Sequence, residues 1–246
     1  MRSITVLLSL VVIVVFFNSA YANPSNLESL PLCQSCHGDK LQGNESLKAP
    51  VISGVSQWYL YRQMKNYKDG IRGNHPQDIF GQTMRLSIMN LSDNELRALA
   101  EHISTISADK QPKTIKGDKE TGKFVFEHCV SCHGEFGEGD QTIGAPRLTG
   151  QSDWYLYQQM INFQKDIRGN HQDDLFGKQM KDMAQMFNEQ MLRDVVSYIS
   201  TIDQADKEAV RIRNYADEES STMREIAKRD AAEILSDAEA KADARL

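Results

Sequence analysis

The chain has 246 residues, of which 40% are hydrophobic and 25% are charged, and its formal net charge is −6. Residues 203–246 contain 12 acidic and 8 basic side chains, so −4 of this charge lies there and the rest of the chain is close to neutral. Because no basic patch is available to neutralise phosphates, this composition argues against nucleic-acid binding. The acidic balance favours partners with a basic surface.

The N-terminus has the layout of a secretory signal peptide. Arg2 precedes an apolar run from Ile4 to Phe17, and Ala20-Tyr21-Ala22 offers small residues for cleavage. The run is shorter than the roughly 18 apolar residues expected of a membrane-spanning helix. We therefore expect cleavage after Ala22 and a mature protein in the periplasm, with an uncleaved N-terminal anchor as the alternative. No later segment is long and apolar enough to span a bilayer.

Two short motifs use all four cysteines: Cys33-Gln34-Ser35-Cys36-His37 and Cys129-Val130-Ser131-Cys132-His133. C-x-x-C-H is the attachment signature of c-type haem. The two thiols can form thioethers with the haem vinyl groups, and the histidine can bind the iron. Disulfides or a zinc site are the alternatives, but neither requires a histidine after each pair. The motifs therefore predict two haem c groups.

The second half of the chain repeats the first without a gap, since Cys129 lies 96 residues after Cys33. The same offset relates Ala49-Pro50 to Ala145-Pro146, Trp58-Tyr59-Leu60-Tyr61 to Trp154-Tyr155-Leu156-Tyr157, Ile71-Arg72-Gly73-Asn74-His75 to Ile167-Arg168-Gly169-Asn170-His171, and Met84 to Met180. A repeat of this length predicts two tandem domains. We assign them to residues 23–113 and 114–203. A small domain has a marginal apolar core, so the haem is expected to be structural as well as functional.

Each copy is expected to be helical with long loops. Leu60, Met64 and Tyr67 follow helical spacing, as do Leu96, Leu99, Ile103 and Ile106 after a capping box formed by Ser92 and Glu95. A short helix should end at the second haem motif, where Phe124, Phe126 and Cys129 suit one, whereas Pro31 should shorten its counterpart in the first copy. Between the middle and last helices, residues 70–90 show no clear period and are predicted to form a long loop.

Each iron needs a second axial ligand, for which methionine and histidine are the usual choices. Met84 and Met180 each lie 47 residues beyond the proximal histidine, and we predict that they are the ligands. Met64 and Met160 also match across the repeat, but their helical spacing indicates a core position. The remaining competitors are Met89, Met183, Met186, His75 and His171, of which the histidines would give haems of lower potential.

Several other matched residues are predicted to lie near the haem edges. Arg72 and Arg168 could pair with haem propionates in charge-assisted contacts, and a plain solvated charge is the alternative. The other residues of this group are His75, His171, Trp58 and Trp154.

These motifs together resemble the cytochrome c4 family. The resemblance covers residues 32–202 and rests on C-x-x-C-H-G, Ala-Pro with a downstream Gly, Trp-Tyr-Leu, Ile-Arg-Gly, and a Met seven residues before the last helix. It implies an all-α fold of two tandem class I cytochrome c domains with His/Met ligation. By position, it assigns Cys33, Cys36, His37 and Met84 to one haem. It assigns Cys129, Cys132, His133 and Met180 to the other.

With both axial positions filled, the expected function is outer-sphere electron transfer between respiratory partners, such as a membrane oxidase or a quinol-oxidising complex, and not catalysis. The gap-free repeat further suggests that the domains pair with pseudo-twofold symmetry. The alternatives are a haem-bearing subunit of a larger redox complex and a diheme enzyme such as a peroxidase, in which one iron would keep an open position.

The charged tail, residues 204–246, is an addition that a minimal member of this family does not need. Its sparse apolar positions suggest a solvated or partly disordered helix. There are three more specific alternatives: the tail docks to a partner, mediates oligomerisation, or associates peripherally with a membrane. The thin helical stripe consists of Met223, Ile226, Ala227, Asp230, Ile234 and Ala238.

Overall fold

The computed structural model describes residues 27–202, 223–226 and 228–229. The predicted signal peptide and most of the predicted tail stripe lie outside these residues. Within the described part of the chain all regular elements are helical, and no helix there has the length and apolarity to cross a membrane. The all-α prediction is therefore confirmed.

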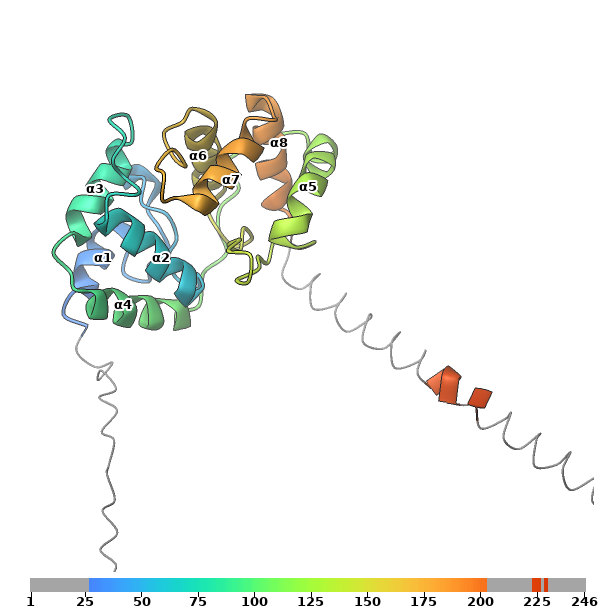
Figure 1. Cartoon of the computed structure of the whole chain (residues 1–246), viewed down its shortest axis with the longest axis horizontal. Helices are drawn as coiled ribbons and strands as arrows, with labels where there is room; N and C mark the ends of the chain where they lie inside the picture. Colours follow the sequence, from blue (N-terminus) through green and yellow to red (C-terminus); the bar gives the residue numbers. More distant parts are fainter. Residues whose placement is uncertain (1–26, 203–222, 227, 230–246) are drawn as a thin grey trace, which may run out of the picture.

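The helices form two groups that lie side by side (Figure 1). Domain 1 contains α1 (Leu30–His37), α2 (Gln57–Lys68), α3 (Ile79–Ile88) and α4 (Asp93–Thr105), with a short 3-10 helix η1 (Glu45–Leu47). Domain 2 contains α5 (Lys119–His133), α6 (Asp153–Gln164), α7 (Leu175–Ala184) and α8 (Glu189–Ile199). The four α-helices of domain 1 thus recur in the same order in domain 2.

The core of domain 1 forms where α2 packs against α4. Leu60, Met64 and Tyr67 supply the buried face of α2, as their spacing predicts, and Met64 is a core residue. They meet the buried face of α4, which includes Leu96, Leu99 and Ile103.

The core of domain 2 forms at a different place, where α5 packs against α8. The length of α5 allows this contact. Val125 and Phe126 of α5 pack with Leu192 and Val195 of α8. At the crossing, a Cβ on Gly122 would collide with the backbone oxygen of Asp194. The helix predicted before the second haem motif is therefore present and longer than expected, whereas Pro31 restricts α1 to eight residues.

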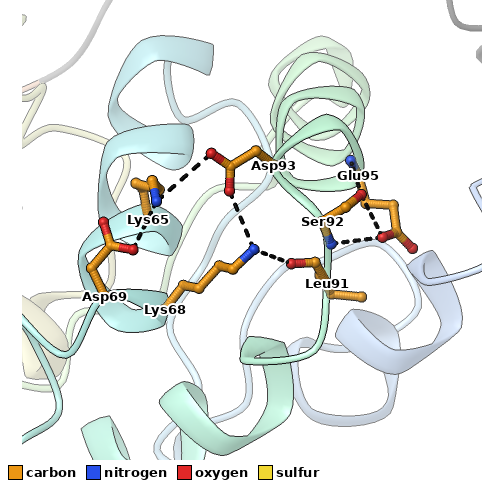
Figure 2. Close-up of polar contacts among 7 residues, drawn as sticks. All are labelled: Lys65, Lys68, Asp69, Leu91, Ser92, Asp93 and Glu95. Carbon is orange, nitrogen blue, oxygen red and sulfur yellow. Dashed lines mark hydrogen bonds and ion pairs between the residues drawn. The ribbon is translucent and has the colours of Figure 1, made fainter.

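A polar cluster fixes the start of α4 against α2 (Figure 2). The hydroxyl of Ser92 accepts from the backbone N–H of Glu95, and the Glu95 carboxylate accepts from the Ser92 backbone N–H at 2.7 Å, which confirms the predicted capping box. Lys68 of α2 donates to the backbone oxygen of Leu91 and to the Asp93 carboxylate, at 2.6 and 3.2 Å. These contacts hold the start of α4 against α2.

The long loop predicted over residues 70–90 is wrong in its second half, which forms α3, and the same is true of α7 in domain 2. Asp78 begins α3 by accepting from the backbone N–H of Gly81, and Asp174 does the same for Gly177. The period of α3 is hidden because large apolar residues lie on its exposed side. Ile79, Phe80 and Leu86 are each more than half exposed, at 66%, 53% and 66%.

Candidate haem-binding sites and the interface between them

Both motif histidines are oriented by a backbone carbonyl. His37 ends α1 with its Nδ1 2.7 Å from the oxygen of Pro50, and His133 ends α5 with its Nδ1 2.8 Å from the oxygen of Pro146. A carbonyl only accepts, so Nδ1 carries the proton and Nε2 keeps its lone pair for a metal. Burial lowers the pKa of both imidazoles. The neutral form that iron requires is thereby favoured.

A compact loop places each carbonyl opposite its histidine. In domain 1 the backbone N–H of Gly43 donates to the His37 oxygen at 2.8 Å, and Asn44 pairs with Ala49 just before Pro50. In domain 2 Gly139 donates to the His133 oxygen at 2.7 Å, and Asp140 pairs with Ala145. The matched Ala-Pro pairs of the sequence therefore serve to orient the histidines.

The four cysteines are placed in the same way in both domains. Cys33 and Cys129 are partly buried and contact the hydrophobic cores, whereas Cys36 and Cys132 are exposed. No disulfide joins them. Burial raises the pKa of Cys33, and raises that of Cys129 to about 11. Each motif thus presents one inner and one outer thiol on the last turn of the helix that also carries the histidine.

The predicted ligand methionines occupy equivalent positions on α3 and α7. Met84 lies on the same helix face as the buried residues Gly81 and Ile88, three residues before it and four after it. It packs against the domain 1 core cluster, as Cys33 also does. Among the competitors, Met89 is 48% exposed.

In domain 2, Met180 is flanked on its helix face by the buried residues Gly177 and Ala184. Met186 is 67% exposed, whereas Met183, like Cys129, packs against the domain 2 core cluster. The exposure of Met89 and Met186 therefore argues against these two residues as iron ligands. In domain 2, Met183 is the main alternative to Met180.

The matched arginines lie at the contact between the domains. Arg72 donates through Nη1 to Gln63 of its own domain at 2.7 Å, and through Nη2 to Tyr155 and Gln159 of the other domain, at 2.8 and 2.9 Å. Its guanidinium carbon lies 4.6 Å from the ring centre of Tyr67. Arg72 is only 7% exposed.

Arg168 repeats this arrangement in the opposite direction. It donates to Gln159 of its own domain at 2.8 Å and to Gln63 and Tyr59 of domain 1 at 3.0 and 3.4 Å. The Nε atoms of both arginines are buried and have no hydrogen-bond partner among the described residues. The reciprocal pattern supports the expected pseudo-twofold pairing of the domains. The repeat also relates Tyr59 to Tyr155 and Gln63 to Gln159, and this match is the sequence signal that could have found these four interface residues.

The matched histidines line a cavity of about 210 Å³ between the two Ile-Arg-Gly-Asn-His loops, together with both arginines. His75 Nδ1 accepts from the backbone N–H of Gln77, and His171 Nδ1 accepts from that of Asp173, both at 3.2 Å. One ring nitrogen of each imidazole is therefore already hydrogen-bonded to the backbone of its own loop.

The tryptophans each lie beside a cation at the interface. The guanidinium carbon of Arg62 is 4.9 Å from the ring centre of Trp58, and Nζ of Lys48 is 5.4 Å from that of Trp154. The second contact joins the two domains.

These residues fit a haem in each domain. The chemistry of the donors is complete, with two thiols, a neutral imidazole whose free nitrogen is available, and a methionine on an inward helix face. The buried guanidiniums with an unpartnered nitrogen suit a nearby carboxylate, because buried cations are normally paired.

Comparison with known proteins agrees with this assignment. The family model described as Cytochrome c matches residues 30–107 and again residues 119–203. Cytochrome c4 of Azotobacter vinelandii is 27% identical over 180 residues, which cover 68% of this chain and 83% of the relative. A protein of Stutzerimonas stutzeri named as a thiosulfate dehydrogenase electron acceptor is 26% identical, over 74% of this chain and 82% of the relative.

A solved structure, that of cytochrome c4 from Acidithiobacillus ferrooxidans, matches with a TM-score of 0.58 and 25% identity, over 70% of this chain and 98% of that one. Two cytochrome c matches in tandem, one on each four-helix group, account for the duplicated haem motifs. The chain therefore belongs to the cytochrome c family, and it is a diheme electron-transfer protein with the organisation of the cytochrome c4 proteins that it resembles.

Proposed function

We propose that this protein is a periplasmic electron carrier whose two haems are each bound by a histidine and a methionine. The observation that supports the proposal is that each domain has a histidine and a methionine, at matched positions, that could serve as the two axial ligands. A buried histidine fixed by a proline carbonyl and a methionine on an inward helix face occur at the same positions of the repeat, in His37 and Met84 and in His133 and Met180.

In this proposal the haem iron supplies a one-electron redox couple, and the protein's own residues set its environment. Pro50 and Pro146 hold the histidine rings in the orientation that leaves Nε2 free. Methionine ligation raises the reduction potential relative to a second histidine. The guanidiniums of Arg72, which is buried, and of Arg168, which is partly buried, favour negative charge nearby, and we propose that haem propionates provide it.

The domain interface gives such a carrier an internal route for electrons. Reciprocal contacts of Arg72 and Arg168 with tyrosines and glutamines fix the orientation of one domain to the other. A fixed orientation keeps the distance between two haems constant, whereas a flexible linker would not. The domains we propose are residues 23–113 and 114–203, after a signal peptide of residues 1–22.

The partners we propose are redox proteins, with a membrane oxidase or a quinol-oxidising complex among them. The similarity to a named electron acceptor of thiosulfate dehydrogenase adds a periplasmic dehydrogenase as a class of donor. Filled axial positions leave no iron site for a substrate, so we propose no catalytic activity for the chain itself.

Replacement of each ligand methionine tests the proposal directly. Met84→Ala should lower one midpoint potential of the purified diheme protein and leave the other nearly unchanged, and Met180→Ala should do the reverse. Met64→Ala, which removes a core methionine of the same domain, is the control for a general packing defect. If Met84→Ala and Met180→Ala leave both potentials in place, the ligands are elsewhere.

A further inference from the structure

One contact at the interface breaks the symmetry of the repeat. Arg62 of α2 donates through Nη2 to the backbone oxygen of Gly144 in domain 2 at 2.7 Å, and its guanidinium carbon lies 4.4 Å from the ring centre of Phe176. The repeat places Gln158 at the equivalent position of α6. Its side-chain amide donates to Asn162 within its own helix, at 2.9 Å. Of these two positions, only that of Arg62 therefore has a cationic side chain that contacts the other domain.

The backbone of domain 2 is shaped to admit this arginine. Gly144 has φ +72°, and a Cβ there would lie 2.7 Å from Nη1 of Arg62. The equivalent residue of domain 1 is Lys48, which adopts φ +53° despite its side chain. The same Cβ would lie 2.4 Å from Cε1 of Phe176, so a side chain at position 144 would displace both Phe176 and Arg62.

Arg62 touches two segments of domain 2, one that orients the proposed histidine ligand and one that carries the proposed methionine ligand. Gly144 lies two residues before Pro146, whose carbonyl oxygen is 2.8 Å from His133 Nδ1. Phe176 lies four residues before Met180 on α7, and residues with this spacing share a helix face. One side chain of domain 1 therefore contacts the histidine side and the methionine side of the second haem site.

We propose that Arg62 is a positioning residue that holds these two segments against domain 1 and raises the reduction potential of the domain 2 haem from across the interface. This inference rests on the proposed function. Reduction adds one electron to the iron, so a nearby fixed cation stabilises the reduced state more than the oxidised state. Salt screens a partly buried cation less than an exposed one.

The surroundings of Arg62 keep the charge in place. Its guanidinium lies over the rings of Trp58 and Tyr59, at 4.9 and 5.3 Å. Burial lowers the pKa of Arg62, while Tyr59 and Asp174 act to raise it and Arg168 acts to lower it. An arginine nevertheless remains protonated at neutral pH.

The repeat supplies a matched cation for comparison. Lys48 occupies the site equivalent to that of Gly144, and its Nζ lies over Trp154 of the other domain, whereas Arg62 lies over Trp58 of its own helix. Lys48 is exposed, whereas Arg62 is partly buried and hydrogen-bonded across the interface. We therefore expect Lys48 to have a much smaller effect on either haem.

The experiment measures both midpoint potentials of the full-length diheme protein, with each potential assigned to its domain by the NMR signals of the haem methyl groups. In Arg62→Gln, which installs the side chain found at position 158, the reduced-to-oxidised ratio of the domain 2 haem at a fixed potential should fall about three- to tenfold. A tenfold fall corresponds to about 59 mV for one electron. The domain 1 haem should change by less than half as much.

Two further variants separate the charge from the geometry. Arg62→Lys keeps the cation and should retain most of the domain 2 potential, and Lys48→Gln should leave both potentials nearly unchanged. The inference is overturned if Arg62→Gln shifts neither haem, shifts both equally, or has no larger effect than Lys48→Gln. The red absorption band of methionine-bound ferric haem is recorded for every protein. A missing band in the parent protein would contradict the proposed function, whereas an intact band with unchanged potentials would contradict this inference alone.

Discussion

Arg72 of domain 1 and Tyr155 of domain 2 are joined by a 2.8 Å hydrogen bond from the guanidinium Nη2 to the phenol oxygen. Their counterparts under the repeat, Arg168 and Tyr59, form the same contact in the opposite direction at 3.4 Å. Among the described residues, the hydrogen-bond partners of both guanidiniums are amide and phenol oxygens, and none is a carboxylate. Each domain thus supplies a buried or partly buried cation whose hydrogen bonds the other domain helps to satisfy.

We expect Arg72→Ala to lower the free energy of unfolding by about 2–4 kcal/mol, because it removes three hydrogen bonds of a buried charged group and leaves their acceptors unpaired. Denaturant unfolding measures this loss, and small-angle X-ray scattering reports whether the domains separate. Arg97, which is exposed and lies over Tyr61, provides the control through Arg97→Ala. Equal losses in the two variants would show that the interface contacts contribute little.

A buried carboxylate of domain 2 holds the linker between the domains. Asp153 is 1% exposed and accepts from the backbone N–H groups of Thr114 and Ile115, at 2.6 and 2.8 Å. Asp153→Ala should cost about 2 kcal/mol of stability and expose the linker to limited proteolysis. The equivalent residue of domain 1 is the exposed Gln57, so Gln57→Ala should change neither property. A linker that stays protected in Asp153→Ala would contradict this reading.

The crossing of α5 over α8 depends on one glycine. In Gly122→Ala the new methyl group would meet the backbone of Asp194, and overpacking of this kind typically costs about 1–3 kcal/mol. Thermal unfolding followed by circular dichroism measures the effect. Lys123→Ala, at the neighbouring exposed position, should be close to neutral. If both variants unfold at the same temperature, the two helices have room to separate.

The start of α4 should become less ordered at acid pH. The start of α8 should not show this pH dependence. Hydrogen bonds from the Ser92 backbone and hydroxyl lower the pKa of the Glu95 carboxyl. Because the folded pKa lies below the unfolded value of about 4.3, the contribution of Glu95 is complete above that pH. It is lost as the pH falls through the folded pKa.

Asn188 caps α8 and does not titrate, and Met191 takes the place of Glu95 there. Amide hydrogen exchange at residues 93–96 and 189–192 between pH 3 and 6 compares the two helix starts. Identical pH profiles would exclude the capping box as the cause. Glu95→Gln should flatten the profile of α4 while leaving that of α8 unchanged.

The sequence predicts local features of this fold well. The spacing of Leu60, Met64 and Tyr67 predicts α2, and Ser92 with Glu95 predicts the start of α4. These succeed because the signals depend on neighbouring residues and because the apolar face of each helix is buried in its own domain.

The helices α3 and α7 could not be predicted in the same way. Their large apolar residues lie on exposed faces, so the apolar period does not mark the buried side, and the capping residues Asp78 and Asp174 are the local signals that could have found them. The interface is also beyond local reasoning. Arg72 and Tyr155 are 83 residues apart, and the repeat shows that both positions are matched without showing which faces of the two domains meet.

If a histidine and a methionine fill both axial positions of each haem, no iron position remains for a substrate. The optical spectrum of the oxidised full-length protein at neutral pH tests this ligation. It should show two low-spin haems and a weak red charge-transfer band of methionine-bound ferric iron, with the intensity of two haems and a loss of half in either Met84→Ala or Met180→Ala. A high-spin signal from either haem of the unmodified protein would contradict this ligation.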